Sequence, residues 1–131
     1  MLQQRLYAEA KHALPVLFQA MDTGGKDGVA RGVFGPLNPQ GVTVASFKRP
    51  SELELSRDYL WRVHLRVPPK GVIGVFNRSH YEDILVPAAH GLLPGKTLER
   101  RCRQINDFER FLTENGTVIL KFFLHISKEM V

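Results

Sequence analysis

A glycine turn after a short apolar run carries the clearest chemistry in the sequence. The segment Ala20-Met21-Asp22-Thr23-Gly24-Gly25-Lys26-Asp27 has the spacing of the phosphate loop Gly-x4-Gly-Lys-Ser/Thr, with Ala20 at the first glycine and Asp27 at the hydroxyl position. The glycine pair allows backbone N–H groups to turn inward around an anion, and the lysine adds a positive charge. The spacing predicts a phosphate-binding turn, and the alternative is an ordinary glycine-rich turn with a solvated surface.

Two carboxylates lie in this turn, where they would repel phosphate unless their charge is offset. Asp22 precedes the glycine pair and Asp27 follows Lys26. Carboxylate oxygens are preferred ligands of hard divalent cations, which also bind phosphate oxygens. We therefore expect a divalent cation between these carboxylates and the bound phosphate.

A second polar pair, Asn77-Arg78, follows another apolar run. Phosphate-loop enzymes usually place an acidic or amide residue near the metal at such a strand end, and an arginine there can neutralise phosphate charge. The alternative for Arg78 is a structural salt bridge to Glu82 or Asp83. We expect Arg78 to bind phosphate.

Three further side chains, Arg101, His80 and Tyr81, have one functional and one structural interpretation each. On a helix that starts at Thr97, Arg101 falls within the apolar stripe, so its guanidinium needs an anion. That anion is either a substrate phosphate or a nearby carboxylate. His80 and Tyr81 come soon after Arg78, and they either line the same site or pack and cap locally.

The elements that must position these residues follow from the apolar runs. Strands are expected at 14–20, 42–47, 71–76 and 117–124, and helices at 26–35, from the capping box of Ser51 and Glu54 up to Pro68, and at 97–114. The expected core includes the helical stripes Leu53, Leu60, Val63 and Val67, then Leu98, Cys102, Ile105, Phe108 and Leu112, together with Trp61, Phe122 and Phe123.

Strands separated by helical crossovers predict an α/β domain with a parallel sheet. Ligands of such sheets bind beyond the carboxyl ends of the strands. Both the glycine turn and Asn77-Arg78 fall at that edge, so the sequence predicts that they form one site.

Composition narrows the class of protein. The chain has 131 residues, 44% apolar residues and a net charge of +5, which fits one soluble domain that attracts anions. A single cysteine argues against a disulfide scaffold or a cysteine-rich zinc module. No apolar run approaches the roughly 20 residues that span a bilayer. We expect a cytoplasmic protein with no membrane partner, and no nucleic-acid partner because the basic residues are dispersed.

The sequence resembles the polyphosphate kinase 2 family of phosphate-loop phosphotransferases over nearly its whole length. The matching blocks are Leu6-Tyr7-Ala8-Glu9, Ala20 to Gly28, Phe34 to Gly41, Phe76-Asn77-Arg78-Ser79-His80-Tyr81-Glu82-Asp83, Gln104 to Glu109 and Leu120 to Glu129. Their common order along the chain makes chance resemblance improbable.

The resemblance implies a three-layer α/β/α phosphate-loop kinase-like fold with a parallel sheet and a helical lid. It places residues 1–131 in one partial domain, with the lid at about 88–104. It implies transfer of phosphoryl groups between inorganic polyphosphate and a nucleoside mono- or diphosphate, such as ADP, AMP or GDP, with magnesium, or alternatively manganese. The enzyme would be a polyphosphate-dependent nucleotide kinase, and family members suggest a homo-oligomer.

Taken with the pattern, the resemblance assigns roles to individual residues. The expected catalytic residues are Asp22, Lys26 and Arg78. Phosphate binding is expected at Thr23, Gly24, Gly25, Lys26, Asp27, Gly28 and Arg101. The expected metal ligands are Asp22, Asp27 and Asn77, although many family members carry Asp at position 77.

Family members look longer at both ends, so the chain looks truncated, and exposed apolar surface is expected where the sheet is incompletely covered. Two alternatives stay open at this point. One is a truncated remnant that binds polyphosphate or nucleotide without catalysis. The other is an ATP-dependent nucleoside monophosphate kinase, which would normally keep the hydroxyl residue that Asp27 replaces.

Overall fold

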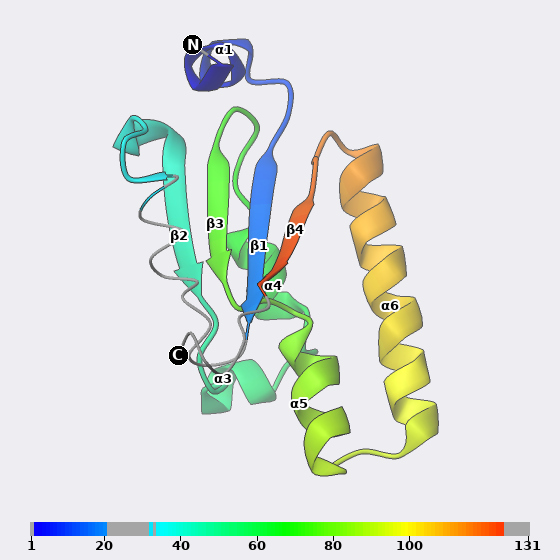
Figure 1. Ribbon diagram of the computed structural model, residues 1–131. Coiled ribbons are helices and arrows are strands. Elements are labelled where there is room, and N and C mark those ends of the chain that lie inside the picture. The colour runs from blue at the N-terminus through cyan, green and yellow to red at the C-terminus, as the bar shows by residue number, and fades with distance from the viewer. Residues whose placement is uncertain (1, 21–31, 33, 125–131) are drawn as a thin grey trace.

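The computed structural model describes residues 2–20, 32 and 34–124, and a parallel sheet lies at its centre (Figure 1). Its strands are β1 Leu14–Ala20, β2 Val42–Ser46, β3 Ile73–Asn77 and β4 Leu120–Leu124. The strand order is β2-β3-β1-β4, and every neighbouring pair is parallel. The predicted α/β class and parallel sheet are confirmed. Two strands start later than expected: β3 starts at Ile73 instead of residue 71, and β4 starts at Leu120 instead of residue 117, where Thr117 makes only an isolated bridge to Ala13.

Helices connect and cover the strands. They are α1 Leu2–Glu9, the 3-10 helix η1 Pro39–Gly41, α3 Glu52–Leu55, α4 Trp61–Arg66, α5 Glu82–His90 and α6 Gly95–Glu114. In Figure 1, α5 and α6 form a helical hairpin whose long arm, α6, runs beside β4. The helix expected at 26–35 falls almost entirely outside the described residues. Among the described helices, none is both long enough and apolar enough to cross a bilayer.

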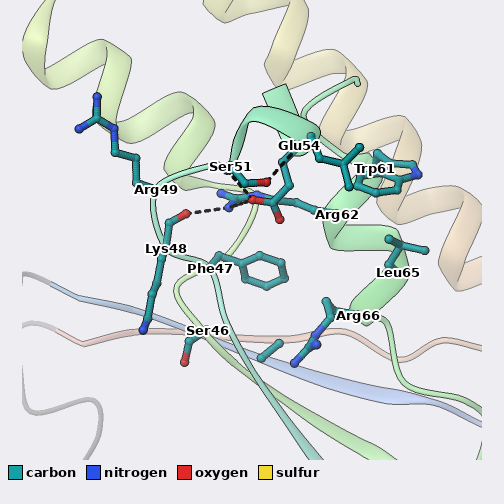
Figure 2. Close-up of a pocket in the computed structure, with 12 residues that line it drawn as sticks. Ser46, Phe47, Lys48, Arg49, Ser51, Glu54, Trp61, Arg62, Leu65 and Arg66 are labelled. Atoms are coloured by element: carbon teal, nitrogen blue, oxygen red, sulfur yellow. Dashed lines mark hydrogen bonds and ion pairs between the residues drawn. The ribbon is translucent and has the colours of Figure 1, made fainter. Parts of the chain in front are cut away.

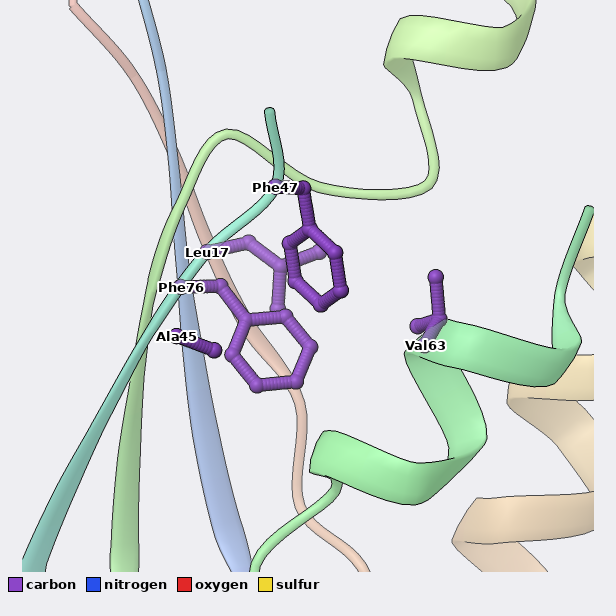
Figure 3. Packing of buried hydrophobic residues seen from close by; sticks show 5 residues of the cluster. All are labelled: Leu17, Ala45, Phe47, Val63 and Phe76. Atoms are coloured by element: carbon purple, nitrogen blue, oxygen red, sulfur yellow. The ribbon is translucent and has the colours of Figure 1, made fainter. Parts of the chain in front are cut away.

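Side chains alternate between the two faces of the sheet, as expected for buried strands. Leu17, Ala45 and Phe76 point to one face, where they meet Val63 of α4 and the ring of Phe47 (Figure 3). The opposite face is built from Val16, Phe18, Ile73 and Val75, against which Leu6 of α1, Phe34 and Leu37 pack. The sheet therefore has an apolar layer on both faces. Polar side chains that could bind a ligand are expected at the ends of the strands instead.

The single helix expected from Ser51 to Pro68 is wrong. The predicted capping box is present, with Ser51 Oγ accepting from the Glu54 N–H and Glu54 Oε1 accepting from the Ser51 N–H. However, α3 ends after one turn, where Ser56 Oγ donates to the Leu53 carbonyl at 2.6 Å. A new helix, α4, begins at Trp61, after Asp58 Oδ1 accepts a hydrogen bond from the Leu60 N–H.

Three parts of the expected core are also corrected. Leu53 is 59% exposed because it lies on the short α3, and Cys102 is exposed on α6 while Ile105 and Leu112 of the same stripe are buried. Phe122 and Phe123 are 46% and 60% exposed, respectively, because β4 is an outer strand of the described sheet. Apolar surface is thus exposed along β4, as predicted for a sheet with incomplete cover.

Candidate functional site

The predicted site lies at the carboxyl edge of the parallel sheet. In the strand register Asn77 at the end of β3 pairs with both Phe18 of β1 and Ser46 of β2. The end of β3 therefore lies between the end of β2 and Phe18 of β1, two residues before Ala20, the last residue of β1. The turn that follows Ala20 is outside the described residues, so these assignments stay predictions: Asp22, Thr23, Gly24, Gly25, Lys26, Asp27 and Gly28.

Arg78 is held at this edge by its backbone and by a buried polar chain. Its φ is +66°, and its N–H donates to the Phe18 carbonyl at 3.1 Å. Its Nε lies 4.0 Å from Glu82 Oε1, which also accepts from Gln19 Nε2 at 3.1 Å. Ser79 Oγ donates to Gln19 Oε1 at 2.8 Å inside the protein. The alternative salt bridge between Arg78 and Glu82 is thus formed, but only as a long contact. The side chain of Arg78 remains 41% exposed at the edge of the sheet.

A cavity of about 300 Å³ opens where β2 and β3 end. It is lined by Ser46, Phe47, Lys48, Arg49, Asn77 and Arg78. Two of its cations, Lys48 and Arg49, are absent from the predicted site. They follow the strand expected at 42–47 directly, so the reasoning that selected residues 77 and 78 would also have selected them.

A wider groove of about 440 Å³ continues from the same loop toward α3 and α4, and Figure 2 shows its lining. Arg62 Nη1 donates to the Lys48 carbonyl at 2.7 Å and lies 3.6 Å from Glu54 Oε1. Arg66 Nη2 donates to the Val44 carbonyl at 2.9 Å. These two arginines are therefore engaged in fixing the β2 strand and the loop after it.

Arg101 is held by α5. Its Nη1 donates to the Asp83 carbonyl at 2.7 Å and lies 3.9 Å from Asp83 Oδ1. Its guanidinium also stacks over the Tyr59 ring, 4.7 Å from the centroid. Burial raises the pKa of Asp83, and the positive charges of Arg62 and Arg101 act in the opposite direction. The carboxylate interpretation of Arg101 is confirmed, while its contact with phosphate stays a prediction.

His80 and Tyr81 are bonded to α6 and β4. His80 Nε2 and Tyr81 Oη each donate to Glu109 Oε2 at 2.8 Å, and Lys121 Nζ donates to Glu109 Oε1 at 2.6 Å. Burial raises the pKa of Glu109, but these three donors outweigh it and hold the pKa at about 2. The packing interpretation of His80 and Tyr81 is thus present in the contacts with Glu109, while their lining of the substrate site stays a prediction.

The expected metal site is only partly within the described residues. Asn77 lies at the end of β3, while Asp22 and Asp27 are outside the described range. Among the residues that are described, no group of three His, Cys, Asp or Glu side chains could hold a metal ion. An amide oxygen and two carboxylates are nevertheless the donor types that magnesium takes. The residue types therefore fit magnesium, and the role of Asn77 as one of its ligands stays a prediction.

Comparison with known proteins agrees with this geometry. Residues 1–130 match the family model described as Polyphosphate kinase 2. The chain is 59% identical over 128 residues to the AMP/ADP-polyphosphate phosphotransferase of Meiothermus ruber, covering 98% of this chain and 48% of that protein. It is 49% identical to the ADP-polyphosphate phosphotransferase of Rhodopseudomonas palustris, with the same two coverages.

Solved structures give the same result for the fold. The crystal structure of polyphosphate kinase 2 from Arthrobacter aurescens superposes with a TM-score of 0.94 at 48% identity, covering 98% of this chain and 47% of that one. The chain thus spans about half the length of the curated relatives it matches.

Proposed function

Because the chain belongs to the polyphosphate kinase 2 family, we propose that it transfers phosphoryl groups between inorganic polyphosphate and a nucleoside mono- or diphosphate. The relatives named above act on AMP and ADP by their names, and a similar protein of Pseudomonas aeruginosa is a GDP-polyphosphate phosphotransferase. ADP and AMP are therefore the acceptors to test first.

One observation carries this proposal beyond family membership. Cations from two neighbouring strand ends, Lys48, Arg49 and Arg78, line a single cavity, and β3, which carries Arg78 at its end, pairs with β1, the strand before the glycine turn. Phosphoryl transfer needs positioning and charge neutralisation more than covalent chemistry from the protein. This cation-lined cavity and the anion-binding turn that the sequence predicts after β1 would together supply both.

Each residue of the proposed site has a distinct task. Lys26 would place a point charge on a phosphate held by the N–H groups of Gly24 and Gly25. Arg78 would neutralise charge on the transferred group, since an arginine stabilises the charge that develops on phosphoryl oxygens. Asp22, Asp27 and Asn77 would hold magnesium, which when bound neutralises phosphate charge.

The α5–α6 hairpin is the proposed lid. The segment 88–104 contains the end of α5, the turn at Gly91 with φ +62°, and the first half of α6. Arg101 in this segment would face polyphosphate only if it left or shared its contacts with Asp83. Closure over the site would therefore weaken or share the contact by which Arg101 connects α6 to α5.

The test is ATP formation from polyphosphate and ADP or AMP in the presence of magnesium, using the chain, Lys26→Ala and the matched control Lys70→Ala. Lys70 precedes β3 at the opposite edge of the sheet and is exposed. We expect transfer that is abolished by Lys26→Ala and kept by Lys70→Ala.

Other outcomes point elsewhere. Full turnover by Lys26→Ala would rule out the glycine turn as the site. Polyphosphate binding without ATP formation by the wild-type chain would indicate a binding remnant. Transfer from ATP to AMP that polyphosphate cannot support would indicate a nucleoside monophosphate kinase.

A further inference from the structure

We propose that Lys48 and Arg49 form a second phosphate-binding position, next to Arg78, that holds phosphate groups of the substrates. This inference rests on the proposed function and adds a part of the site that lies after β2. The shared chemistry is a chain of phosphate groups, which either polyphosphate or the phosphates of the nucleotide would supply.

The first argument is position. Lys48 and Arg49 follow β2 after Phe47, and Asn77 and Arg78 lie at the end of β3, its parallel neighbour. All four residues line the same cavity of about 300 Å³. The Phe47 N–H donates to the Asn77 carbonyl at 3.2 Å, which fixes the two strand ends against each other. A phosphate bound at Arg78 would therefore have Lys48 and Arg49 on the adjoining wall.

The second argument is charge. Within the described part of the chain, the side chains of Lys48 and Arg49 make no hydrogen bond or ion pair, and both residues are exposed. The nearby carboxylates are already engaged, since Glu54 accepts from Ser51 and lies near Arg62, while Glu82 accepts from Gln19. Cations gathered around one cavity repel one another unless an anion joins them. A polyanion with several charges matches this arrangement.

The third argument is contrast with other arginines, of which Arg62 and Arg66 line the neighbouring groove and Arg57 lies at its Trp61. Arg62 and Arg66 bond to backbone carbonyls, and Arg57 lies over the ring of Trp61 at 4.5 Å. Those three side chains have structural partners within the protein, whereas Lys48 and Arg49 extend from the loop in different directions (Figure 2). Arg62 also holds the Lys48 carbonyl, so the backbone of the loop is fixed while its cations are available.

The two cations would bind phosphate differently. The guanidinium of Arg49 can donate two parallel hydrogen bonds to one phosphate, and the ammonium of Lys48 acts as a compact point charge. Replacement of either side chain by glutamine removes the charge and keeps a polar side chain. Because both residues are exposed, neither replacement should change the urea midpoint of unfolding.

The test is calorimetric titration of the chain with linear polyphosphate of defined length, with ADP and with AMP, at fixed magnesium and salt. The variants are Lys48→Gln, Arg49→Gln and the control Lys70→Gln, which removes the same charge at the opposite edge of the sheet. We expect Lys48→Gln and Arg49→Gln each to weaken at least one ligand about tenfold, equal to about 1.4 kcal/mol. The control should bind every ligand within about twofold of the wild type, because distant surface charges are screened.

The ligand that is weakened identifies the source of the phosphates. Loss confined to polyphosphate assigns Lys48 and Arg49 to the polyphosphate chain, and loss confined to ADP and AMP assigns them to the nucleotide. Binding of all three ligands by both variants at the level of Lys70→Gln would overturn the inference, as would a wild-type chain that binds none of them.

The same proteins, assayed for ATP formation, separate this inference from the proposed function. If the wild-type chain forms ATP and both variants bind the ligands unchanged, the proposed phosphate position at Lys48 and Arg49 is wrong and the proposed transfer stands. If the chain forms no ATP but its binding of polyphosphate or nucleotide depends on Lys48 and Arg49, the phosphate position is supported and the proposed transfer is wrong.

Discussion

The carboxylate of Glu109 on α6 lies 2.8 Å from Nε2 of His80, a buried residue in the turn after β3. The same carboxylate accepts from Tyr81 in that turn and from Lys121 on β4. Since His80 comes two residues after Arg78, Glu109 connects α6 to the segment that carries this arginine. Helix α6 and the end of β3 are therefore joined through one side chain.

Replacement of Glu109 by glutamine should destabilise the fold. His80 and Lys121 would keep their places without an anionic partner, and a hydrogen bond to a charged group contributes about 1.5–3 kcal/mol. We expect the free energy of unfolding, measured in urea, to fall by about that amount. Glu114→Gln is the control because Glu114 is exposed and lies 3.9 Å from Arg110. An equal loss of unfolding free energy in both variants would show that the hydrogen bonds of Glu109 stabilise the fold no more than an exposed ion pair does.

Stability should also decrease in acid because of this residue. Folding lowers the pKa of Glu109 from 4.5 to about 2, so the folded chain binds this proton more weakly than the unfolded chain does. The stabilisation is fully present above about pH 4.5 and is lost as the pH falls toward 2. Urea unfolding at several pH values should show that the wild type and Glu109→Gln converge in acid. A constant difference between them down to pH 2 would contradict this.

Arg78 should be strained where it stands. Its φ of +66° is in the left-handed region, which costs a non-glycine residue about 1 kcal/mol or more. Arg78→Gly should therefore unfold at higher urea than Arg78→Ala, although neither variant has a guanidinium. The difference expected is about 1 kcal/mol. A glycine variant less stable than the alanine variant would mean that the backbone relaxes at this position.

Gly74 in β3 should tolerate no side chain. A Cβ there would lie 2.8 Å from Cδ and Cγ of Pro68, which is buried against the strand. Gly74→Ala should cost about 1–3 kcal/mol of stability through overpacking. Gly95→Ala, at the open start of α6, meets no atom within 4 Å and should be neutral or stabilising by up to about 1 kcal/mol. Thermal unfolding of the two variants measures both effects, and equal midpoints would exclude the clash.

The strands could be predicted because their apolar runs are buried on both faces of the sheet. Val16, Leu17 and Phe18 face alternate layers and are all buried, so the run needs no polar alternation. The capping box at Ser51 was equally readable because it depends on two residues three apart. Helices α1 and α5 were not predicted, and Pro87 inside α5 disrupts the usual helical pattern.

The rest depended on contacts that sequence patterns do not contain. The break after α3 comes from Ser56 bonding back to the Leu53 carbonyl, which competes with continuation of the helix. The link between Glu109 and Lys121 requires the register of β4 against β1, which brings α6 and β4 into contact. Lys48 and Arg49 were readable from their place after a strand, but no motif marks them.

Strand β2 is an outer strand of the described sheet, and Val44 in its middle is 62% exposed. The outward carbonyls of such a strand can accept hydrogen bonds from a strand of another molecule, which leads to aggregation. The guanidinium of Arg66 takes the Val44 carbonyl at 2.9 Å and places a positive charge at that border. We therefore expect Arg66 to oppose edge-to-edge β-pairing between molecules along β2.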